Sequence, residues 1–314
     1  MMSERETPRR RVGLVVLNWN GGEVLPACLA SLDAAVTHSR HAVTRLLVDN
    51  ASTDGSADAA LRTHPQWELL RLDSNRRFAG GMNAGLQLLL ARDLDHVCVL
   101  NNDTEADPDL LDPLVDALEQ DPRAGGVCPR IHYADPRDRM WYAGGAVSRF
   151  STVSRHLGLR KPAAGRWLVP AETGYLTGCC LMGRGEFWRS TGGFDESFGL
   201  YAEDVDLSLR ARALGWGLRY APAALLYHRV GFASGGGLAA TKLRAQRKAV
   251  LHLLRRHVPA WRRPLALAAW GLHVLRGALA ARLRGERGVG GALVRAMGSG
   301  GGETGPKQSR ERSA

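Results

Sequence analysis

Two short polar clusters and one histidine carry the side chains of this sequence that are best suited to chemistry. The first cluster is NND at residues 101–103, directly after the apolar run Val97–Leu100. Carboxylate and amide oxygens are ligands that Mg²⁺ and Mn²⁺ prefer, and these ions often bind through one or two carboxylates together with substrate phosphates. Asn and Asp also favour turns after a strand. Taken alone, the cluster favours a turn over a metal site.

The second cluster is EDVD at residues 203–206, at the start of a predicted helix. Acidic side chains are stabilised there by the helix dipole, which would be a sufficient explanation for an isolated cluster. The cluster follows GGFD at residues 192–195, in a predicted loop, where functional carboxylates concentrate. One of its carboxylates could therefore act as a general base that takes the proton of an attacking hydroxyl group.

The histidine is His228, which follows the apolar run Ala223–Tyr227. A single histidine is more often structural than metal-binding, so its type alone decides nothing. Its position after a predicted strand makes it a candidate metal contact.

Hydrophobic periodicity indicates the elements that position these side chains. In the first 130 residues, short apolar runs alternate with helical patterns, which predicts a Rossmann-like parallel sheet covered by helices on both faces. Proline is expected in the first turn of the last of these helices. The predicted strands are 12–17, 46–48, 67–72, 97–100 and 126–128, and the predicted helices are 24–32, 56–62, 79–91 and 108–119.

Polar loops directly follow three of these strands: NWNG at 18–21, DNAS at 49–52 and NND at 101–103. In open α/β sheets, ligands bind in the crevice outside the carboxyl ends of the strands. We therefore expect all three loops on one edge of the sheet. The run GGMNAG at 80–85 fits neither the dinucleotide-binding nor the Walker pattern, and its glycines would let a helix approach a ligand or a strand closely.

The rest of the chain is less regular. Residues 131–177 are predicted to form a loop-rich insertion with short strands, followed by a strand at 179–182 and helices at 185–190 and 203–214. From residue 241 the pattern becomes helical and basic. Residues 1–10 and the Gly-rich segment 285–314 are predicted to be disordered.

The net charge of +11 is unevenly distributed. Residues 1–240 contain 26 Lys and Arg against 28 Asp and Glu, a net of −2, whereas residues 241–314 contain 16 against 3, a net of +13. A basic segment suggests an anionic partner such as nucleic acid, a membrane surface or a phosphorylated small molecule. In residues 241–284, basic residues alternate with apolar ones and with Trp261, a pattern that suits a peripheral helix on an anionic membrane. Packing on the catalytic domain is an equal alternative.

The five cysteines match neither a disulfide framework nor a zinc site, because their number is odd and none stands at CxxC spacing. A reducing cytoplasm is the simplest expectation. The sequence contains no signal-peptide pattern and no run of about 18 apolar residues, the length that marks a membrane span.

Seven motifs follow one another along the chain. They are VVLNWNG (15–21), LLVDNASTDGS (46–56), NRRFAGGMNAGL (75–86), VLNNDTE (99–105), TGCCLMGRGEF (177–187), GGFDESFGLYAEDVDLSLRARALGW (192–216) and LLYHRVGFASG (225–235). In this order they resemble the motifs of family 2 glycosyltransferases, and most closely those of the rhamnosyltransferase-like branch of bacteria. The resemblance covers roughly residues 11–235. It implies a GT-A fold, that is, an α/β mixed, mostly parallel sheet flanked by helices, with a basic helical extension added.

The resemblance also implies an activity, the inverting transfer of a sugar from a nucleoside-diphosphate sugar to a hydroxyl group. The catalytic domain would span residues 11–240, with a nucleotide-binding half at 11–130 and an acceptor-binding half at 131–240. The donor would be a dTDP-, UDP- or GDP-linked sugar, with rhamnose suggested by the branch. The acceptor would be a glycan or a polyprenyl-linked molecule, which would place the protein in the cytoplasm, peripheral on the inner face of the membrane.

Site residues follow from the resemblance by position. Asp204 would be the general base, and Asp103 with His228 would hold Mg²⁺ or Mn²⁺. The family's acidic D-x-D motif has Asn101 at its first acidic position here, which would weaken metal binding. Asp49 would contact the edge of the base. The full set of donor-binding residues would be Asn18, Asn20, Asp49, Ser52, Asn75, Asn83 and Asn102, and the acceptor-side candidates are Gly178, Glu203 and Trp141.

Two other classes of function remain open. Asn101 leaves room for a non-catalytic nucleotide-sugar-binding protein, although the presence of Asp103, Asp204 and His228 argues against it. A nucleic-acid-binding protein would fit the charge, but the basic residues are confined to one end and no known nucleic-acid-binding signature is present, so no nucleic-acid partner is expected. A nucleotidyltransferase would carry a Gly-rich basic loop after the first strand, which NWNGGEVLP lacks.

Overall fold

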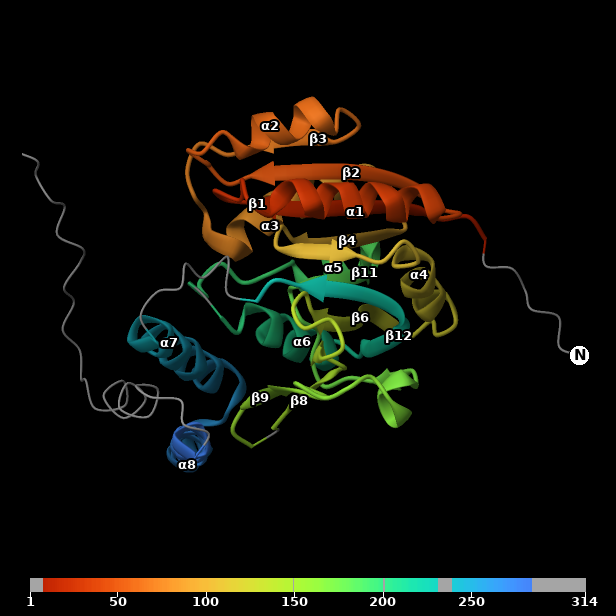
Figure 1. The fold of residues 1–314 in the computed structure, drawn as a ribbon. Coiled ribbons are helices and arrows are strands. Elements are labelled where there is room, and N and C mark those ends of the chain that lie inside the picture. The colour runs from red at the N-terminus through yellow and green to blue at the C-terminus, as the bar shows by residue number, and fades with distance from the viewer. Residues whose placement is uncertain (1–7, 149, 200, 231–238, 284–314) are drawn as a thin grey trace, which may run out of the picture.

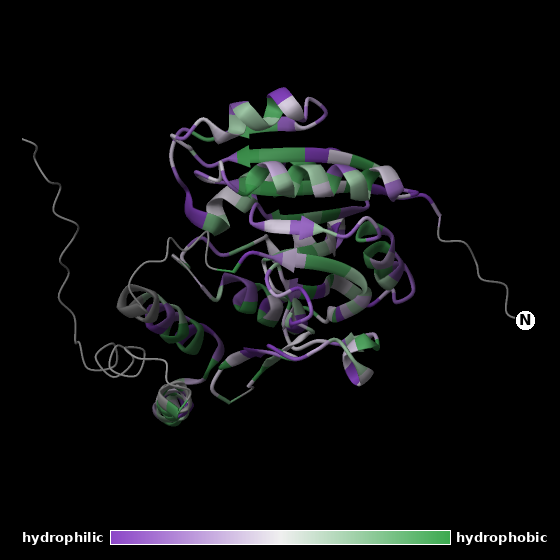
Figure 2. Cartoon of the chain, in the orientation of Figure 1, coloured by the Kyte–Doolittle hydropathy of each residue, from purple (hydrophilic) through white to green (hydrophobic). Residues whose placement is uncertain are grey.

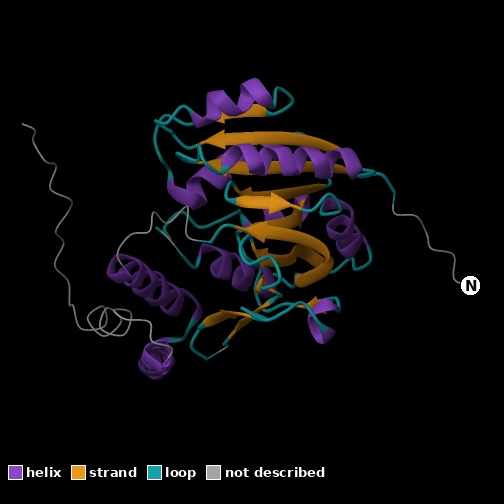
Figure 3. Cartoon of the chain, in the orientation of Figure 1, coloured by secondary structure: helices purple, strands orange, loops and turns teal. Residues whose placement is uncertain are grey.

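The computed structural model describes residues 8–148, 150–199, 201–230 and 239–283. Within these ranges, the chain forms a ten-stranded mixed sheet with helices on both faces, and a separate two-stranded sheet (Figures 1 and 3). The main path of the large sheet has the strand order β10-β12-β6-β11-β4-β1-β2-β3. The predicted tails at 1–10 and 285–314 lie outside the described residues, apart from residues 8–10.

Residues 11–101 form the predicted alternation of strands and helices. The strands pair in parallel in the order β4-β1-β2-β3. Helix α1 lies on one face of this sheet and α3 on the other (Figure 1). The elements are β1 (Arg11–Asn18), α1 (Leu25–His38), β2 (Ala42–Asp49), α2 (Ser56–Thr63), β3 (Glu68–Arg71), α3 (Arg77–Leu90) and β4 (His96–Asn101).

Two glycines of α3 explain the GGMNAG run. A Cβ atom on Gly81 would lie 2.5 Å from Leu17 Cδ1, and one on Gly85 would lie 2.6 Å from Val15 Cγ1. Real Cβ contacts are longer, so these glycines allow α3 to pack directly on β1. The close approach is therefore to a strand, and the interior of this half is correspondingly apolar (Figure 2).

The segment after β4 differs from prediction. Strand β5 (Thr104–Ala106) follows the NND cluster and pairs with a distant strand, and helix α4 (Leu111–Glu119) begins three residues later than expected. The prediction that Pro108 lies in the first turn of this helix is wrong. Pro108 lies in a turn, which the Leu110 amide closes by donating to the Asp107 carbonyl.

The second half contains the expected short strands between residues 131 and 177. Strand β11 runs antiparallel between β4 and β6, which makes the sheet mixed, and β12 runs parallel to β6. The elements are β6 (Ala124–Tyr133), β7 (Met140–Tyr142), β8 (Gly145–Val147), β9 (Ser154–His156), η1 (Gly165–Leu168), β10 (Ala171–Glu172), β11 (Cys180–Arg184), α5 (Gly185–Thr191), α6 (Glu203–Ala213) and β12 (Gly217–His228).

The C-terminal extension comprises α7 (Ala239–His257), η2 (Ala260–Arg262) and α8 (Arg263–Leu283). Helix α7 packs on the catalytic domain, because Ala249 and Leu253 belong to the main hydrophobic core. Helix α8 leaves most of its leucines exposed. None of the described helices is apolar over a length that could cross a membrane. All five cysteines are buried and free.

Candidate active site

The three polar loops lie on one edge of the sheet, as predicted. Asn18 at the end of β1 pairs in register with Asp49 at the end of β2, and its neighbour Leu17 pairs with Asn101 at the end of β4. The carboxyl ends of these parallel strands therefore bring the loops at 18–21, 49–52 and 101–103 together. This edge is where a ligand is expected in an open α/β sheet.

Asn18 and Asn102 hold the three loops in place. Asn18 is fully buried and donates from Nδ2 to Ser56 Oγ at 2.8 Å and to Ser52 Oγ at 3.2 Å. Asn102 donates from Nδ2 to Asn18 Oδ1 at 2.8 Å. These bonds occupy both ends of the Asn18 amide, so Asn18 shapes the loops from inside.

Asp49 lies under the same loops with 1% of its surface exposed. Its carboxylate accepts from the Ser52 amide at 3.2 Å and from Arg71 Nη1 at 3.2 Å. Asn20 adopts a left-handed backbone conformation and accepts from the Thr53 amide at 2.8 Å, which joins the first loop to the second. A carboxylate held in this way is oriented before any ligand arrives.

Trp19 belongs to the first loop and was not among the predicted site residues. Its side chain is 52% exposed, although a large aromatic residue is usually much more buried. An exposed indole next to a polar loop offers a flat surface for stacking. The NWNG motif already indicated an exposed Trp19, because a tryptophan between turn-forming residues is not positioned to pack in the hydrophobic core.

Asn50 and Arg77 are two further residues that sequence reasoning did not assign. Asn50 is buried, and its amide donates to Asn75 Oδ1 at 3.1 Å and to the Arg77 carbonyl at 3.0 Å. Arg77 starts α3 in a left-handed conformation with φ of 59°. Asn75 therefore contributes to a hydrogen-bonded loop that fixes the N-terminus of α3, where the helix dipole and two arginines favour an anion.

Asn83 links α3 to the loop before α6. Its Nδ2 donates to the Phe194 carbonyl at 2.8 Å and to Glu196 Oε1 at 3.0 Å, and its Oδ1 accepts from the Phe194 amide at 2.9 Å. Asn83 thus joins α3 to the loop at residues 194–196, and its amide group is engaged by the protein.

Asp103 and His228 meet because β5 pairs with β12. His228 lies opposite Thr104 in this pairing, and its Nε2 atom is 3.3 Å from Asp103 Oδ1. Both side chains are nearly buried, yet Asp103 Oδ1 and His228 Nδ1 accept or donate no hydrogen bond within the described part of the chain. A buried carboxylate oxygen that accepts no hydrogen bond and lies 3.3 Å from an imidazole nitrogen fits the ligands of a divalent cation.

This pair would supply two ligands. Among the described residues, no group of three or more His, Cys, Asp or Glu side chains could hold a metal. A cation such as Mg²⁺ or Mn²⁺ commonly completes its coordination with substrate phosphate oxygens and water. The pair therefore suits a metal that arrives with, or is held by, a phosphorylated ligand.

Trp141 packs against His228. Its ring meets the His228 ring edge-on with centroids 4.5 Å apart, and meets His156 on its other side at 4.2 Å. Burial lowers the pKa of His156 to about 4, so this ring is neutral at pH 7. Trp141 thereby connects the loop-rich insertion to the end of β12.

Asp204 begins α6 and faces a loop glycine. Its Oδ2 atom accepts from the Gly178 amide at 3.1 Å, and its Oδ1 atom accepts from the Val205 amide at 2.8 Å. Burial raises the pKa of Asp204, while these backbone hydrogen bonds oppose the rise. A Cβ atom on Gly178 would lie 2.9 Å from the Phe78 ring, so only glycine fits here without displacement of that ring.

Glu203 is the second carboxyl group of the pair. Burial and the charge of Asp204 raise the pKa of Glu203 to about 8. Its Oε2 atom is buried without a hydrogen-bond partner in the described structure. Glu203, with its pKa raised to about 8, is mostly protonated at neutral pH, whereas the Asp204 carboxylate accepts hydrogen bonds from two backbone amides.

This arrangement is that of a known family. The model of glycosyl transferase family 2 matches residues 14–188, which is more than half of the chain. The chain belongs to glycosyl transferase family 2. It is 32% identical over 288 residues to the N-acetylglucosaminyl-diphospho-decaprenol L-rhamnosyltransferase of Mycobacterium tuberculosis, an alignment that covers 86% of this chain and 90% of the relative.

Other relatives and solved structures agree with this assignment. The O-antigen biosynthesis protein RfbC of Myxococcus xanthus is 29% identical over 230 residues, although the match covers only 16% of that protein. The mannosyltransferase PcManGT of Pyrobaculum calidifontis, solved with GDP-Man and Mn²⁺, superposes with a TM-score of 0.56 at 20% identity and covers 93% of this chain and 87% of that one.

A third structure shares the fold over a smaller part of its length. GalNAc-T7, solved with UDP, GalNAc and Mn²⁺, has a TM-score of 0.56 at 15% identity, and the match covers 76% of this chain and 48% of that chain. These superpositions confirm the predicted GT-A fold for this family 2 glycosyltransferase, and the identity to the mycobacterial enzyme makes it rhamnosyltransferase-like.

Proposed function

We propose that this glycosyltransferase transfers rhamnose from a nucleoside-diphosphate donor to a hydroxyl group of a glycan or polyprenyl-linked acceptor, with inversion at the anomeric carbon. The observation that carries the proposal is the position of Asp204, a half-buried carboxylate with a raised pKa at the start of α6, held by the Gly178 amide. The identity to the mycobacterial rhamnosyltransferase supports the sugar and the lipid-linked acceptor.

The reaction is a single displacement. The acceptor oxygen forms a bond to the anomeric carbon while the bond from that carbon to the phosphate oxygen breaks, and the acceptor proton passes to the Asp204 carboxylate. Glu203 does not compete for this proton at neutral pH, because its raised pKa keeps it protonated. General-base catalysis contributes about 10²–10⁴-fold, and positioning of both substrates supplies a further share.

A divalent cation fits beside the leaving group. Asp103 and His228 are the residues that would hold it, through the carboxylate Oδ1 and the imidazole Nε2, which lie 3.3 Å apart. When bound, Mg²⁺ or Mn²⁺ neutralises the charge that develops on the diphosphate. Asn101 at the first acidic position of the motif leaves one carboxylate fewer, so metal affinity is expected to depend on the donor diphosphate.

The donor side is formed by the loops at the ends of β1 and β2. Asp49 is oriented to contact the edge of the base, and Trp19 offers an exposed face on which the base can stack. Arg77, at the N-terminus of α3, is placed to meet phosphate oxygens. The remaining donor-side residues of the proposal are Asn18, Asn20, Ser52, Asn75, Asn83 and Asn102.

The acceptor side is formed by Gly178, Glu203 and Trp141. Protonated Glu203 can donate a hydrogen bond from its buried, unpartnered oxygen. Trp141 provides a partly exposed aromatic surface beside His228, of the kind that packs against sugar rings. In this proposal, these residues line the approach of the acceptor hydroxyl to Asp204.

A donor panel with product analysis tests this proposal. The full chain is incubated with dTDP-rhamnose, UDP-sugars or GDP-sugars, Mg²⁺ or Mn²⁺, and a polyprenyl-diphosphate N-acetylglucosamine acceptor. We expect transfer from dTDP-rhamnose, with the anomeric configuration of the product opposite to that of the donor in NMR spectra. Retention of configuration would refute the single displacement, and donor binding without any transfer would favour a non-catalytic nucleotide-sugar-binding protein.

A further inference from the structure

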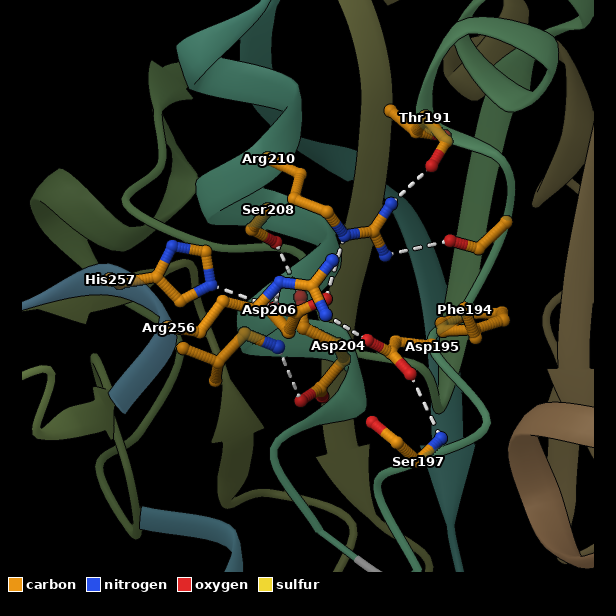
Figure 4. A network of polar contacts seen from close by, with 12 residues as sticks. Thr191, Phe194, Asp195, Ser197, Asp204, Asp206, Ser208, Arg210, Arg256 and His257 are labelled. Atoms are coloured by element: carbon orange, nitrogen blue, oxygen red, sulfur yellow. Dashed lines mark hydrogen bonds and ion pairs between the residues drawn. The ribbon is translucent and has the colours of Figure 1, made fainter. Parts of the chain in front are cut away.

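Helix α7 belongs to the basic extension, yet it reaches the helix that carries the proposed base. We propose that Arg256 and His257 of α7 are positioning residues, which hold α6 and its Asp204 in the reactive arrangement. This inference rests on the proposed function, because it assumes that Asp204 is the base. Figure 4 shows both side chains directed at Asp206, two residues beyond Asp204.

The first observation is a buried carboxylate that α7 helps to satisfy. Asp206 is fully buried, with 0% of its surface exposed. His257 Nε2 donates to Asp206 Oδ1 at 2.7 Å, and Arg210 Nε of the same helix donates to Oδ2 at 2.7 Å. Arg256 Nε lies 3.3 Å from Oδ1. Two of the three groups that contact this carboxylate therefore come from the extension.

The charge of Asp206 depends on these contacts. Burial would raise the pKa of Asp206, but the hydrogen bonds from His257 and Arg210 outweigh burial, so the pKa lies below its usual value. An ionised carboxylate without water must be matched by hydrogen bonds and opposite charge, and removal of one partner is strongly unfavourable. Without α7, the first turn of α6 would have to move so that Asp206 could reach water.

The second observation is that α7 also holds the loop that leads to Asp204. Arg256 Nη1 forms an ion pair with Asp195, and His252 Nε2 lies 3.1 Å from Ser197 Oγ. The His252 ring meets the Phe198 ring edge-on at 4.4 Å. From the other side, Arg210 donates to the Gly193 carbonyl at 2.8 Å. The loop and the helix start are thus fixed to the same short segment of α7.

The third observation is local backbone strain next to the base. Tyr201 and Ala202, which directly precede α6, have φ values of 72° and 70°. Non-glycine residues are strained in this left-handed region and persist there only where surrounding contacts hold them. Asp204 lies two residues after Ala202, and the Asp206 amide donates to the Ala202 carbonyl. The contacts from α7 act on both sides of this strained junction.

Because the loops after β1 and β2 lie apart from the contacts of Arg256 and His257, donor binding can distinguish a positioning role from a general loss of stability. The donor-side residues Asn18, Asp49 and Trp19 lie on β1, β2 and their loops, and the contacts of Arg256 and His257 are with α6 and the loop before it. Loss of a positioning contact should therefore slow transfer and leave donor affinity unchanged. Loss of general stability would reduce both in proportion to the unfolded fraction.

The test compares full-chain variants in kinetic and donor-binding assays below their melting temperatures. Arg256→Ala and His257→Ala should lower kcat about tenfold to 100-fold, the range caused by a small misplacement of a catalytic group. Their Kd for the nucleotide sugar should stay within about twofold, because in the described part of the chain Asn83 is the only proposed donor-side residue that hydrogen-bonds to the loop that α7 holds. Arg256→Lys and His257→Gln, which keep a donor group, should recover much of the loss. Arg255→Ala removes the same charge from the neighbouring exposed residue and should retain wild-type kcat.

Two results would overturn the positioning role of α7, and a third would refute the proposed base. Wild-type kcat in folded Arg256→Ala and His257→Ala would overturn the positioning role. A parallel loss of kcat and donor binding, without recovery in the Lys and Gln variants, would overturn it too, because that pattern describes packing alone. Asp204→Asn is assayed alongside, and normal transfer by that variant would refute the proposed base rather than the contacts of α7.

Discussion

At the scale of single residues, two adjacent carboxyl groups have different environments. Burial and the charge of Asp204 raise the pKa of Glu203 to about 8, while backbone amides oppose the effect of burial on the pKa of Asp204. Groups whose environments differ in this way can act as base and hydrogen-bond donor in one site, which is the division of roles proposed for this pair. The sequence motif identified the pair, but contacts that shape these environments come from residues distant in the chain, such as Gly178.

The pKa of Glu203 leads to a prediction about stability. A carboxyl group whose pKa is raised by folding binds a proton more tightly in the folded state, so its contribution to stability falls as pH rises from about 4.5 to 8. Glu203→Gln removes this penalty. Its melting temperature should match that of the wild type near pH 5 and exceed it at pH 9, by about 2–4 °C for each kcal/mol of penalty.

Thermal unfolding from pH 5 to pH 9 measures this difference. Glu23→Gln, at an exposed position, is the matched control and should show no pH-dependent gain. A melting-temperature difference for Glu203→Gln that stays constant across the pH range would contradict the buried, protonated state of Glu203.

At the scale of elements, the nucleotide-binding half was predictable because its signals are local. Continuous apolar runs such as Val97–Leu100 fill both faces of a parallel strand, and polar loops mark the strand ends. The three-residue strand β5 was missed because the strand with which it pairs, β12, lies more than a hundred residues away in the chain. That pairing joins Asp103 to His228, which the residue pattern offered as separate candidate ligands and the resemblance to the family combined as a pair.

The extension illustrates the same limit. Its sequence left packing and membrane contact equally open, and the contacts of α7 with Asp206 and Asp195 show packing for that helix. The role of Arg256 could not be predicted, because an arginine in a basic run looks the same whether it faces solvent or a buried carboxylate. The missed Trp19 and Arg77 had visible signals, namely an aromatic residue in a turn and a cation before a helix.

The packing of α3 on β1 gives a prediction at this scale. A methyl group on Gly85 would lie 2.6 Å from Val15 Cγ1 and 2.8 Å from Val48 Cγ2, and both neighbours are core strand residues with little room to move. Gly85→Ala should therefore lower the free energy of unfolding by about 1–3 kcal/mol, as overpacked cores do. Gly271→Ala is the control, since nothing lies within 4 Å of its added Cβ atom.

Denaturant unfolding measures both variants. Gly271→Ala should leave stability unchanged or raise it by up to about 1 kcal/mol, because alanine is the better helix former. A Gly85→Ala protein as stable as Gly271→Ala would show that α3 does not pack as tightly on the sheet as described.

At the scale of the whole molecule, the charge of +11 separates into a nearly neutral catalytic body and a strongly basic C-terminal quarter. Helix α7 uses part of that charge in the ion pairs of Arg256 with Asp195 and Asp206. Helix α8 differs, because it carries apolar residues around much of its surface. Its exposed leucines, with Trp261 and Arg262 before them, are Leu265, Leu267, Leu272, Leu275, Leu279 and Leu283.

We infer from this surface that α8 contacts an anionic membrane, where a polyprenyl-linked acceptor would be available. Leucine and tryptophan side chains enter the interfacial region, and nearby arginines interact with anionic headgroups. Leu272→Glu/Leu279→Glu should reduce sedimentation with phosphatidylglycerol liposomes at least tenfold. Leu214→Glu, at a similarly exposed position on a different element, should retain wild-type binding. Equal binding of all three proteins would eliminate this role of α8.

The central claim is that the carboxylate of Asp204 removes the acceptor proton, and one comparison tests it most directly. Asp204→Asn keeps the size of the side chain and removes its basicity, so transfer should fall by about 10²–10⁴-fold while donor Kd in the presence of Mg²⁺ stays unchanged. Asp109→Asn changes an exposed carboxylate outside the proposed site and serves as the control, for which normal transfer is expected. Near wild-type transfer by Asp204→Asn would contradict the account.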